Sequence, residues 1–147
     1  MIEVIKGDMF AESYELIVNP INCVGVMGGG LAAIFRRRYP KAHEDYVVAC
    51  GQGKVKVGTM FMTFTDGQDI AHFPTKDHYR DPSEMSYVVD GMRDLRSILG
   101  TVGYKSCAIP ALGCGLGGLD WVDVLPVITE ALSGYTGHAV IFEPMEM

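Results

Sequence analysis

The segment from Asn19 to Phe35 constrains the fold most, because it joins a strand pattern to a helix pattern through three consecutive glycines. An apolar run, Leu16–Val18, precedes it, and Leu31, Ile34 and Phe35 follow at helical spacing. Glycines at the start of a helix leave backbone N–H groups open, and the helix dipole favours an anion there. The segment is typical either of a phosphate-binding loop or of a tight turn that binds nothing.

The composition narrows the class of protein. A chain of 147 residues that is 48% hydrophobic is expected to form one domain, residues 1–147. The net charge of -6 argues against tight, sequence-independent binding of nucleic acid. The four cysteines lack the spacing of a zinc site or a disulfide framework, so no metal or cofactor is expected. With no apolar run of about 20 residues and no signal-peptide pattern, the protein is expected to be soluble and cytoplasmic.

Strand patterns alternate with helix patterns along the chain, which predicts an α/β fold with helices on both faces of a mixed sheet. Asp66-Gly67 is a strong hairpin signal, and Asp81, Pro82 and Glu84 form a helix-start pattern. The expected strands are 1–5, 12–19, 59–64, 69–73, 106–110 and 138–142. The expected helices are 31–39, 41–50, 81–99 and 122–132. Asp81 is the expected N-cap of the third helix and Gly100 its stop, and Asp120 is the expected N-cap of the last.

A second glycine-rich loop follows the strand expected at 106–110. Gly113, Gly115 and Gly118 match the GxGxxG pattern of dinucleotide-binding folds. The context does not fit that fold, because only one helix and one strand follow the loop. We expect instead that this loop and the first one face each other across a cleft. Two such loops would hold a pyrophosphate with backbone amides and would need no positive net charge.

Four ordered motifs together resemble the ligand-contacting segments of macrodomains. They are Lys6–Phe10, Asn19 with Asn22 and Met27–Ala32, Phe73–Ser83, and Pro110–Trp121. The subgroup is similar to human terminal ADP-ribose protein glycohydrolase and to the DarG antitoxins that oppose DarT toxins. The resemblance spans nearly the whole chain. It implies a three-layer α/β/α macrodomain with about six strands that binds ADP-ribose.

The resemblance also implies roles for single residues. Asp8 would meet the adenine amine, although an Asp after a glycine more commonly caps a turn. Asn22 would orient the distal ribose, and the two glycine-rich loops would hold the pyrophosphate and that ribose. The implied binding set is Asp8, Met9, Asn19, Asn22, Gly28, Gly29, Gly30, Leu31, Thr75, His78, Gly113, Cys114, Gly115, Leu116, Gly117 and Gly118.

Lys76 is the implied catalytic residue. A desolvated lysine in a cleft loses its proton readily and then acts as a nucleophile or base, here at the anomeric carbon of the distal ribose. His78 and Arg80 are expected to tune Lys76 or to contact the leaving nucleotide. Cys114 with His78 as base is the rival arrangement. The human enzyme carries an acidic residue where this chain has Gly117, which favours the DarG-like branch.

The sequence thus predicts an ADP-ribosyl glycohydrolase that removes ADP-ribose from modified DNA bases. Single-stranded DNA is the favoured substrate, protein adducts are the variant, and a DarT-like ADP-ribosyltransferase is the expected counterpart. Two alternatives stay open. One is an ADP-ribose-1″-phosphate phosphatase, and the other is a module that binds ADP-ribose without turnover.

Overall fold

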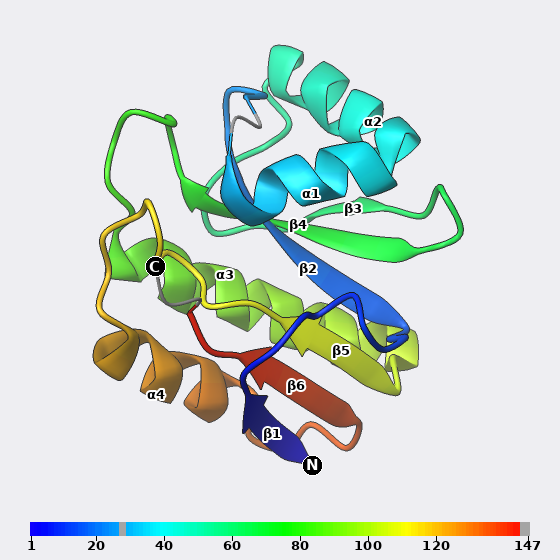
Figure 1. Ribbon diagram of the computed structural model, residues 1–147, viewed down its shortest axis with the longest axis vertical. Helices are drawn as coiled ribbons and strands as arrows, with labels where there is room; N and C mark the ends of the chain where they lie inside the picture. Colours follow the sequence, from blue (N-terminus) through cyan, green and yellow to red (C-terminus); the bar gives the residue numbers. More distant parts are fainter. Residues whose placement is uncertain (27–28, 145–147) are drawn as a thin grey trace.

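Six stretches of the chain form one sheet, and helices cover both of its faces in the computed structural model (Figure 1). The structure describes residues 1–26 and 29–144. The strands are β1 (Ile2–Ile5), β2 (Leu16–Asn22), β3 (Phe61–Thr63), β4 (Asp69–Lys76), β5 (Ser106–Ile109) and β6 (His138–Phe142). The helices are α1 (Gly30–Arg38), α2 (Pro40–Gly51), α3 (Met85–Ile98) and α4 (Trp121–Ala131). The strand order is β1-β6-β5-β2-β4-β3, and neighbouring strands run parallel except β3 and β4, which are antiparallel.

Alternation along β2 explains the three layers, because successive side chains of a strand point to opposite faces. Leu16 and Val18 pack in the cluster that α3 and α4 supply with residues such as Met92. Ile17, between them, packs on the other face in the cluster that contains Phe35 of α1. The predicted three-layer fold with a mixed, six-stranded sheet is therefore confirmed.

Two elements begin later than predicted. The second strand begins at Leu16 and not at residue 12, because Glu15 is held in the preceding turn: its N–H donates to Ser106 Oγ at 2.8 Å, and its carboxylate accepts from Lys105 N at 2.6 Å. The third helix begins at Met85, not at 81, because Ser83 N donates to the Gly117 carbonyl at 3.0 Å and Glu84 is extended. The extended backbone at Glu84 overrides the helix-start signal.

Other ends shift by smaller amounts. The third helix continues past the predicted stop at Gly100 through a π turn, Leu99–Gly103, and ends where Gly103 has a φ of +82°. Asp120 does occupy the N-cap position of α4, but its side chain makes no cap hydrogen bond. The final strand has its predicted bounds.

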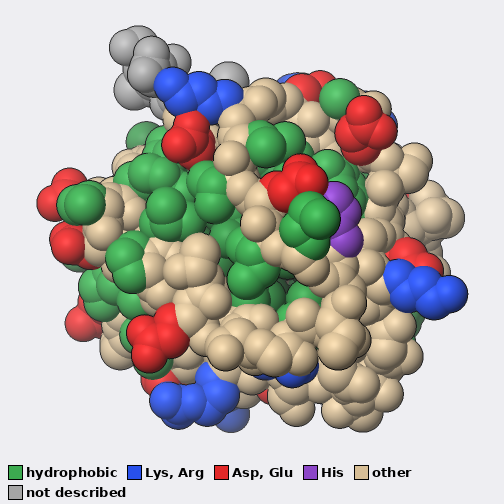
Figure 2. All heavy atoms as spheres, turned by 90° about the horizontal axis from the view of Figure 1, so that it is seen from below, with side chains coloured by type: hydrophobic (Ala, Val, Ile, Leu, Met, Phe, Trp, Pro, Cys, Tyr) green, Lys and Arg blue, Asp and Glu red, His purple; other side chains and the backbone are tan. Residues whose placement is uncertain are grey.

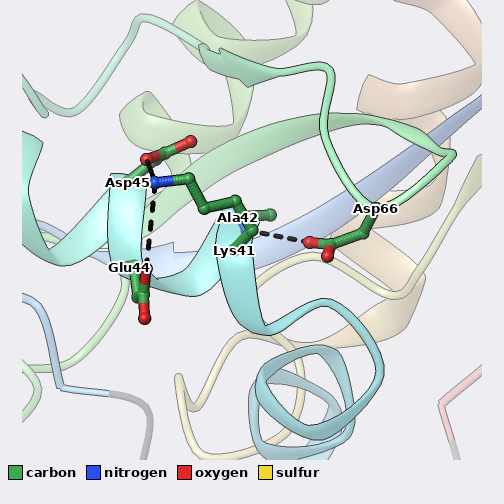
Figure 3. A network of polar contacts seen from close by, with 5 residues as sticks. All are labelled: Lys41, Ala42, Glu44, Asp45 and Asp66. Atoms are coloured by element: carbon green, nitrogen blue, oxygen red, sulfur yellow. Dashed lines mark hydrogen bonds and ion pairs between the residues drawn. The ribbon is translucent and has the colours of Figure 1, made fainter.

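The predicted hairpin is present, and its turn also supports a helix. Asp66 and Gly67 both have positive φ angles (58° and 72°) between β3 and β4. The Asp66 carboxylate accepts a hydrogen bond from Ala42 N, in the first turn of α2, at 2.9 Å (Figure 3). A negative charge at this end of a helix is stabilising. Lys41 beside it pairs with Asp45 at 3.3 Å and Glu44 at 3.8 Å, so this cation is already engaged.

The β1 edge of the sheet leaves apolar side chains in the open. Ile2, Val4 and Ile5 are each more than a third exposed. The face seen from below in the view of Figure 1 carries gathered hydrophobic side chains (Figure 2). None of the helices in the described part of the chain has the length and apolar character needed to cross a membrane.

Candidate functional site

Three loops meet at one edge of the sheet, because β2, β4 and β5 run parallel and their carboxyl ends therefore lie together (Figure 1). The first loop follows β2 and leads into α1. The second, residues 77–84, follows β4, and the third, residues 110–120, follows β5. Ligands of open α/β sheets bind outside such strand ends. The predicted site residues of these loops are thus brought to one edge.

Asn22 organises the first loop with its side chain. Its amide oxygen accepts from the N–H groups of Val24 (3.0 Å) and Gly25 (3.1 Å), and its amide nitrogen donates to the Val26 carbonyl at 2.6 Å. The Tyr46 hydroxyl of α2 also donates to this oxygen at 3.0 Å. The amide of Asn22 therefore fixes the course of the chain before the glycines.

The glycines that follow are open. Gly29 is the N-cap residue of α1 and makes no side-chain cap bond, and Gly30 has a φ of +59° with free space where a Cβ would stand. Leu31 is half-buried and packs against the core beside Phe35. Gly28 lies outside the described residues. Among the described residues, no side chain caps the first N–H groups of α1, as an anion site requires.

The third loop is held by its own backbone. Leu119 N donates to the Gly113 carbonyl at 2.9 Å, and Gly118 N donates to the Gly115 carbonyl at 3.3 Å. A Cβ at Gly113 would lie 2.7 Å from Leu119 Cδ1, and one at Gly117 would overlap Ser83 Oγ and lie 2.5 Å from the Gly113 carbonyl oxygen. No acidic side chain fits at 117 without displacing Ser83.

The two glycine-rich loops approach each other. A Cβ on Gly29 would lie 3.9 Å from Leu116 Cδ1, and Leu116 is 83% exposed although it is apolar. Gly115 and Gly118 have open space at their Cα atoms. The two loops therefore lie next to each other at Gly29 and Leu116, and the ligand cleft expected between them stays a prediction.

A bulge in β4 places Lys76 beside Asn22. Ile21 pairs with Pro74, but the next residue of β2, Asn22, pairs with Lys76, so Thr75 is the extra residue. Thr75 is buried, and its hydroxyl donates to the Ile21 carbonyl at 3.5 Å. Bulges often re-aim a side chain next to a functional site. Here the bulge aligns Lys76 with Asn22, and no sequence signal predicted it.

The second loop is braced around Lys76. Lys76 Nζ donates to the Tyr79 carbonyl at 3.2 Å, and His78 Nδ1 accepts from Arg80 N at 3.1 Å. Ser83 is buried, and its Oγ has no hydrogen-bond partner among the described residues. Tyr79 and Ser83 lie in the Phe73–Ser83 motif, but the sequence analysis gave neither of them a role, since neither side chain is charged.

Asp8 and Met9 follow β1, whose end lies at the same sheet edge. Asp8 is exposed and its Oδ1 accepts from Phe10 N at 2.9 Å, which is the local turn weighed in the sequence. Met9 is only 5% exposed and lies in the core cluster that contains Phe35. The structure therefore gives Met9 a packing role. Within residues 1–26 and 29–144, Oδ1 is the Asp8 carboxylate oxygen with a hydrogen bond, which leaves the other oxygen for a ligand amine.

Asn19 lies inside the molecule and does not reach the loops. It is fully buried, and its Nδ2 lies 3.1 Å from His72 Nδ1, while His72 Nε2 lies 2.9 Å from Thr63 Oγ1. The Tyr46 ring stacks on His72 at 5.9 Å. Burial, followed by the nearby His43, lowers the pKa of His72 to about 3. This neutral network links β2 to the neighbouring strand β4, on which His72 is the register partner of Asn19. The sequence analysis gave His72 no role.

The thiols near the loops are not activated. Burial, with Asp120 second, raises the pKa of Cys114 to about 11, and burial, with Asp77 second, raises that of Cys23 to about 12. A thiol with such a pKa is protonated at neutral pH and is a poor nucleophile. The rival arrangement with Cys114 as nucleophile is therefore disfavoured.

A separate cavity of about 540 Å³ lies at the opposite edge of the sheet, between the starts of β5 and β6. Its lining includes Arg96, Tyr104 and Tyr135 but none of the predicted site residues. We place the site at the loops, because the glycines, Asn22 and Lys76 converge there. Across residues 1–26 and 29–144, no three His, Cys, Asp or Glu side chains are grouped to hold a metal ion.

Comparison with known proteins agrees with the macrodomain resemblance found in the sequence. The sequence model of the macro domain family matches residues 18–128. A Thermus aquaticus protein named DNA ADP-ribosyl glycohydrolase is 39% identical over 99% of this chain and 42% of its own length. The solved macrodomain of Mycobacterium tuberculosis DarG covers 99% of both chains with a TM-score of 0.94 and 41% identity.

A third relative comes from Thermosipho africanus. Its DNA ADP-ribosyl transferase-DNA ADP-ribosyl glycohydrolase fusion protein is 31% identical over 99% of this chain and 42% of its own length. A structure of Thermosipho africanus DarTG in complex with ADP-ribose superimposes with a TM-score of 0.92 at 30% identity, covering 99% of this chain and 42% of that one. The chain thus spans about two fifths of the length of these two curated relatives.

Proposed function

The chain belongs to the macro domain family, and from this premise we propose that it is an ADP-ribosyl glycohydrolase that removes ADP-ribose from modified DNA bases. The observation that carries the proposal is the pairing of Lys76 with Asn22 beside two facing glycine-rich loops. The names of the Thermus and Thermosipho relatives support the reaction and the DNA adduct. Residues 1–147 would form the one macrodomain that does this.

In this proposal the two loops bind the pyrophosphate and the distal ribose. The N–H groups of the first turn of α1 face one side of the pyrophosphate, and the open glycines 115 and 118 face the other. The free carboxylate oxygen of Asp8 meets the adenine amine. Because backbone amides supply the positive ends, a protein of charge -6 can hold this anion.

Lys76 acts at the anomeric carbon of the distal ribose, as a nucleophile or as a base that activates water. The bond from that carbon to the DNA base breaks, the base leaves with the electron pair and takes a proton, and water supplies the hydroxyl of free ADP-ribose. The bulge at Thr75 and the bond to the Tyr79 carbonyl position the amine for this step. Positioning of this kind contributes much of the rate in enzymes.

The favoured substrate is single-stranded DNA, since a modified base must leave a duplex stack to enter such a site. The lack of room for an acid at 117 supports this branch over cleavage of protein carboxylate adducts. We propose in addition a cytoplasmic location and a DarT-like ADP-ribosyltransferase as the antitoxin's counterpart, a pairing that the Thermosipho fusion supports.

The test is Lys76→Ala, with the exposed Lys54→Ala as matched control. A residue that acts only in the transition state lowers turnover and spares ground-state affinity. We therefore expect Lys76→Ala to keep its calorimetric affinity for ADP-ribose and to release ADP-ribose from modified single-stranded DNA at least about a hundredfold more slowly. Lys54→Ala should match the wild type in both measurements.

The same assay compares substrates at fixed ionic strength. Faster release from glutamate-modified protein than from DNA would move the enzyme to the protein branch. Release of inorganic phosphate from ADP-ribose-1″-phosphate, with none from DNA, would favour the phosphatase. ADP-ribose binding with no turnover of any substrate would leave a binding module.

A further inference from the structure

Three planar side chains in the loop after Lys76 are not used in the binding of the pyrophosphate, the distal ribose and the adenine proposed above, although the resemblance places His78 in the binding set. The rings of His78 and Tyr79 stack with centroids 4.5 Å apart and planes at 27°, and the guanidinium carbon of Arg80 lies 5.4 Å from the Tyr79 centroid. We call these three residues the planar cluster. The tight turn of residues 77–81 brings them together.

The planar cluster is held in place by the backbone. Asp81 N donates to the His78 carbonyl at 3.0 Å, and Arg80 N donates to His78 Nδ1 at 3.1 Å. On either side, Cys23 N donates to the Asp77 carbonyl at 3.1 Å and Ser83 N donates to the Gly117 carbonyl at 3.0 Å. The loop is therefore tied to both glycine-rich loops, so little ordering cost remains for a ligand that meets it.

The cluster is also open and close to the reaction centre. Tyr79 is 40% exposed, and Lys76 Nζ lies 3.2 Å from the Tyr79 carbonyl oxygen. An aromatic ring that is not buried in the core, stacked with an imidazole and a guanidinium, is a surface on which a further flat group can stack. A group bonded to the substrate beyond the anomeric carbon would pass this surface.

The local charges favour a base over a phosphate as the occupant. Arg80 is the one permanent cation of residues 77–84, and Asp77, Asp81 and Glu84 outnumber it. A backbone phosphate would meet net negative charge here. Stacking needs no net positive charge, and every nucleobase has a face that can stack.

We propose that His78, Tyr79 and Arg80 form a stacking subsite for an unmodified nucleobase next to the ADP-ribosylated base in a single strand. The inference rests on the proposed DNA substrate and adds a second point of contact with the strand. Such a subsite explains how an acidic protein selects DNA, because it binds the base next to the adduct by stacking and does not bind the phosphate backbone.

The experiment measures binding without turnover, so that it stays separate from the test of activity. Single-stranded oligonucleotides with one ADP-ribosylated base carry either normal neighbours or an abasic residue on the 5′ or 3′ side. Their affinities are measured by fluorescence anisotropy on Lys76→Ala protein, with and without Tyr79→Leu. Tyr79→Trp and Phe64→Leu serve as controls, because the first keeps a ring at the cluster and the second removes a 65% exposed ring from the distant hairpin.

We expect one of the two abasic substitutions to weaken binding about tenfold in Lys76→Ala protein. Adding Tyr79→Leu should weaken binding of the normal oligonucleotide to the same degree and abolish the difference between normal and abasic strands. Tyr79→Trp should restore that difference, and Phe64→Leu should leave it intact.

Equal affinity for normal and abasic strands in Lys76→Ala protein would overturn the proposal. So would a Tyr79→Leu loss that is equally large for free ADP-ribose, because that would show a merely structural role. Neither result depends on whether the wild type releases ADP-ribose, so failure of the proposed activity would be seen separately.

Discussion

Two strand–loop units flank the site, and they are built by opposite means. In the first, β2 carries buried polar groups. Asn19 contacts His72 of the neighbouring strand β4, and Asn22 forms hydrogen bonds with the backbone of the loop that follows it. In the second, the buried residues of β5, Cys107–Ile109, are apolar, and Gly113 and Gly117 in its loop are packed where no side chain fits. One loop is fixed by hydrogen bonds from side chains, and the other by hydrogen bonds within its backbone and by steric fit.

The glycines of the two loops differ in what their missing side chains make room for. Gly30 faces open space, and a Cβ on Gly29 would meet only Leu116 Cδ1 at 3.9 Å, so their missing side chains leave room for a ligand. Gly117 is closed off by Ser83 and the Gly113 carbonyl, so its missing side chain leaves room for the protein itself. Substitutions in each unit test this distinction separately.

Acid should weaken the unit held by polar groups most strongly. Because His72 has a folded pKa of about 3 and an ordinary unfolded pKa near 6.5, the unfolded chain binds a proton between these values and the folded one does not. The contribution of His72 to the free energy of unfolding is therefore fully present above pH 6.5 and is lost as the pH falls toward 3. We expect a loss of about 3 kcal/mol from this residue by pH 4, measured by urea unfolding.

His72→Gln isolates this contribution, since glutamine does not titrate. The variant should be less stable than the wild type at pH 7, and the gap between the two free energies of unfolding should narrow as the pH falls to 4. If the free energies of unfolding of the two proteins changed in parallel with pH, His72 would have an ordinary pKa in the folded protein. The polar contacts of β2 would then not depend on its titration.

Gly117→Ala should weaken the unit held by steric fit. The added methyl group would overlap Ser83 Oγ and crowd the Gly113 carbonyl, so the loop must shift. We expect a loss of about 1–3 kcal/mol in the free energy of unfolding, the usual cost of overpacking. Gly115→Ala, two residues away in open space, is the matched control and should change stability by less than about 0.5 kcal/mol. A Gly117→Ala protein as stable as that control would contradict the steric account.

Much of this architecture follows from the sequence, because burial and turn chemistry act locally. Alternation along β2 and the Asp66-Gly67 turn are written in residue types, and the fold built on them was predicted correctly. The bulge at Thr75 and the contact of Ser83 with Gly117 join segments distant in the chain, so no local pattern reveals them. For the same reason the helix start at 81 was mispredicted, since Ser83 bonds to a loop more than thirty residues later.

Gly29→Ala should have the smallest effect, on ligand affinity and not on the fold. Its φ is not in the left-handed region, and its Cβ would make only an ordinary contact, 3.9 Å from Leu116 Cδ1. The melting temperature should therefore stay within about 1 °C of the wild type. The new methyl group would stand between the two glycine-rich loops, where the proposed pyrophosphate approaches the N-terminus of α1. We expect ADP-ribose affinity to fall about fivefold by calorimetry, which corresponds to about 1 kcal/mol. Unchanged affinity would mean that the ligand does not pass between the loops at Gly29. A lower melting temperature with unchanged affinity would show that Gly29, like Gly117, is a glycine of the fold.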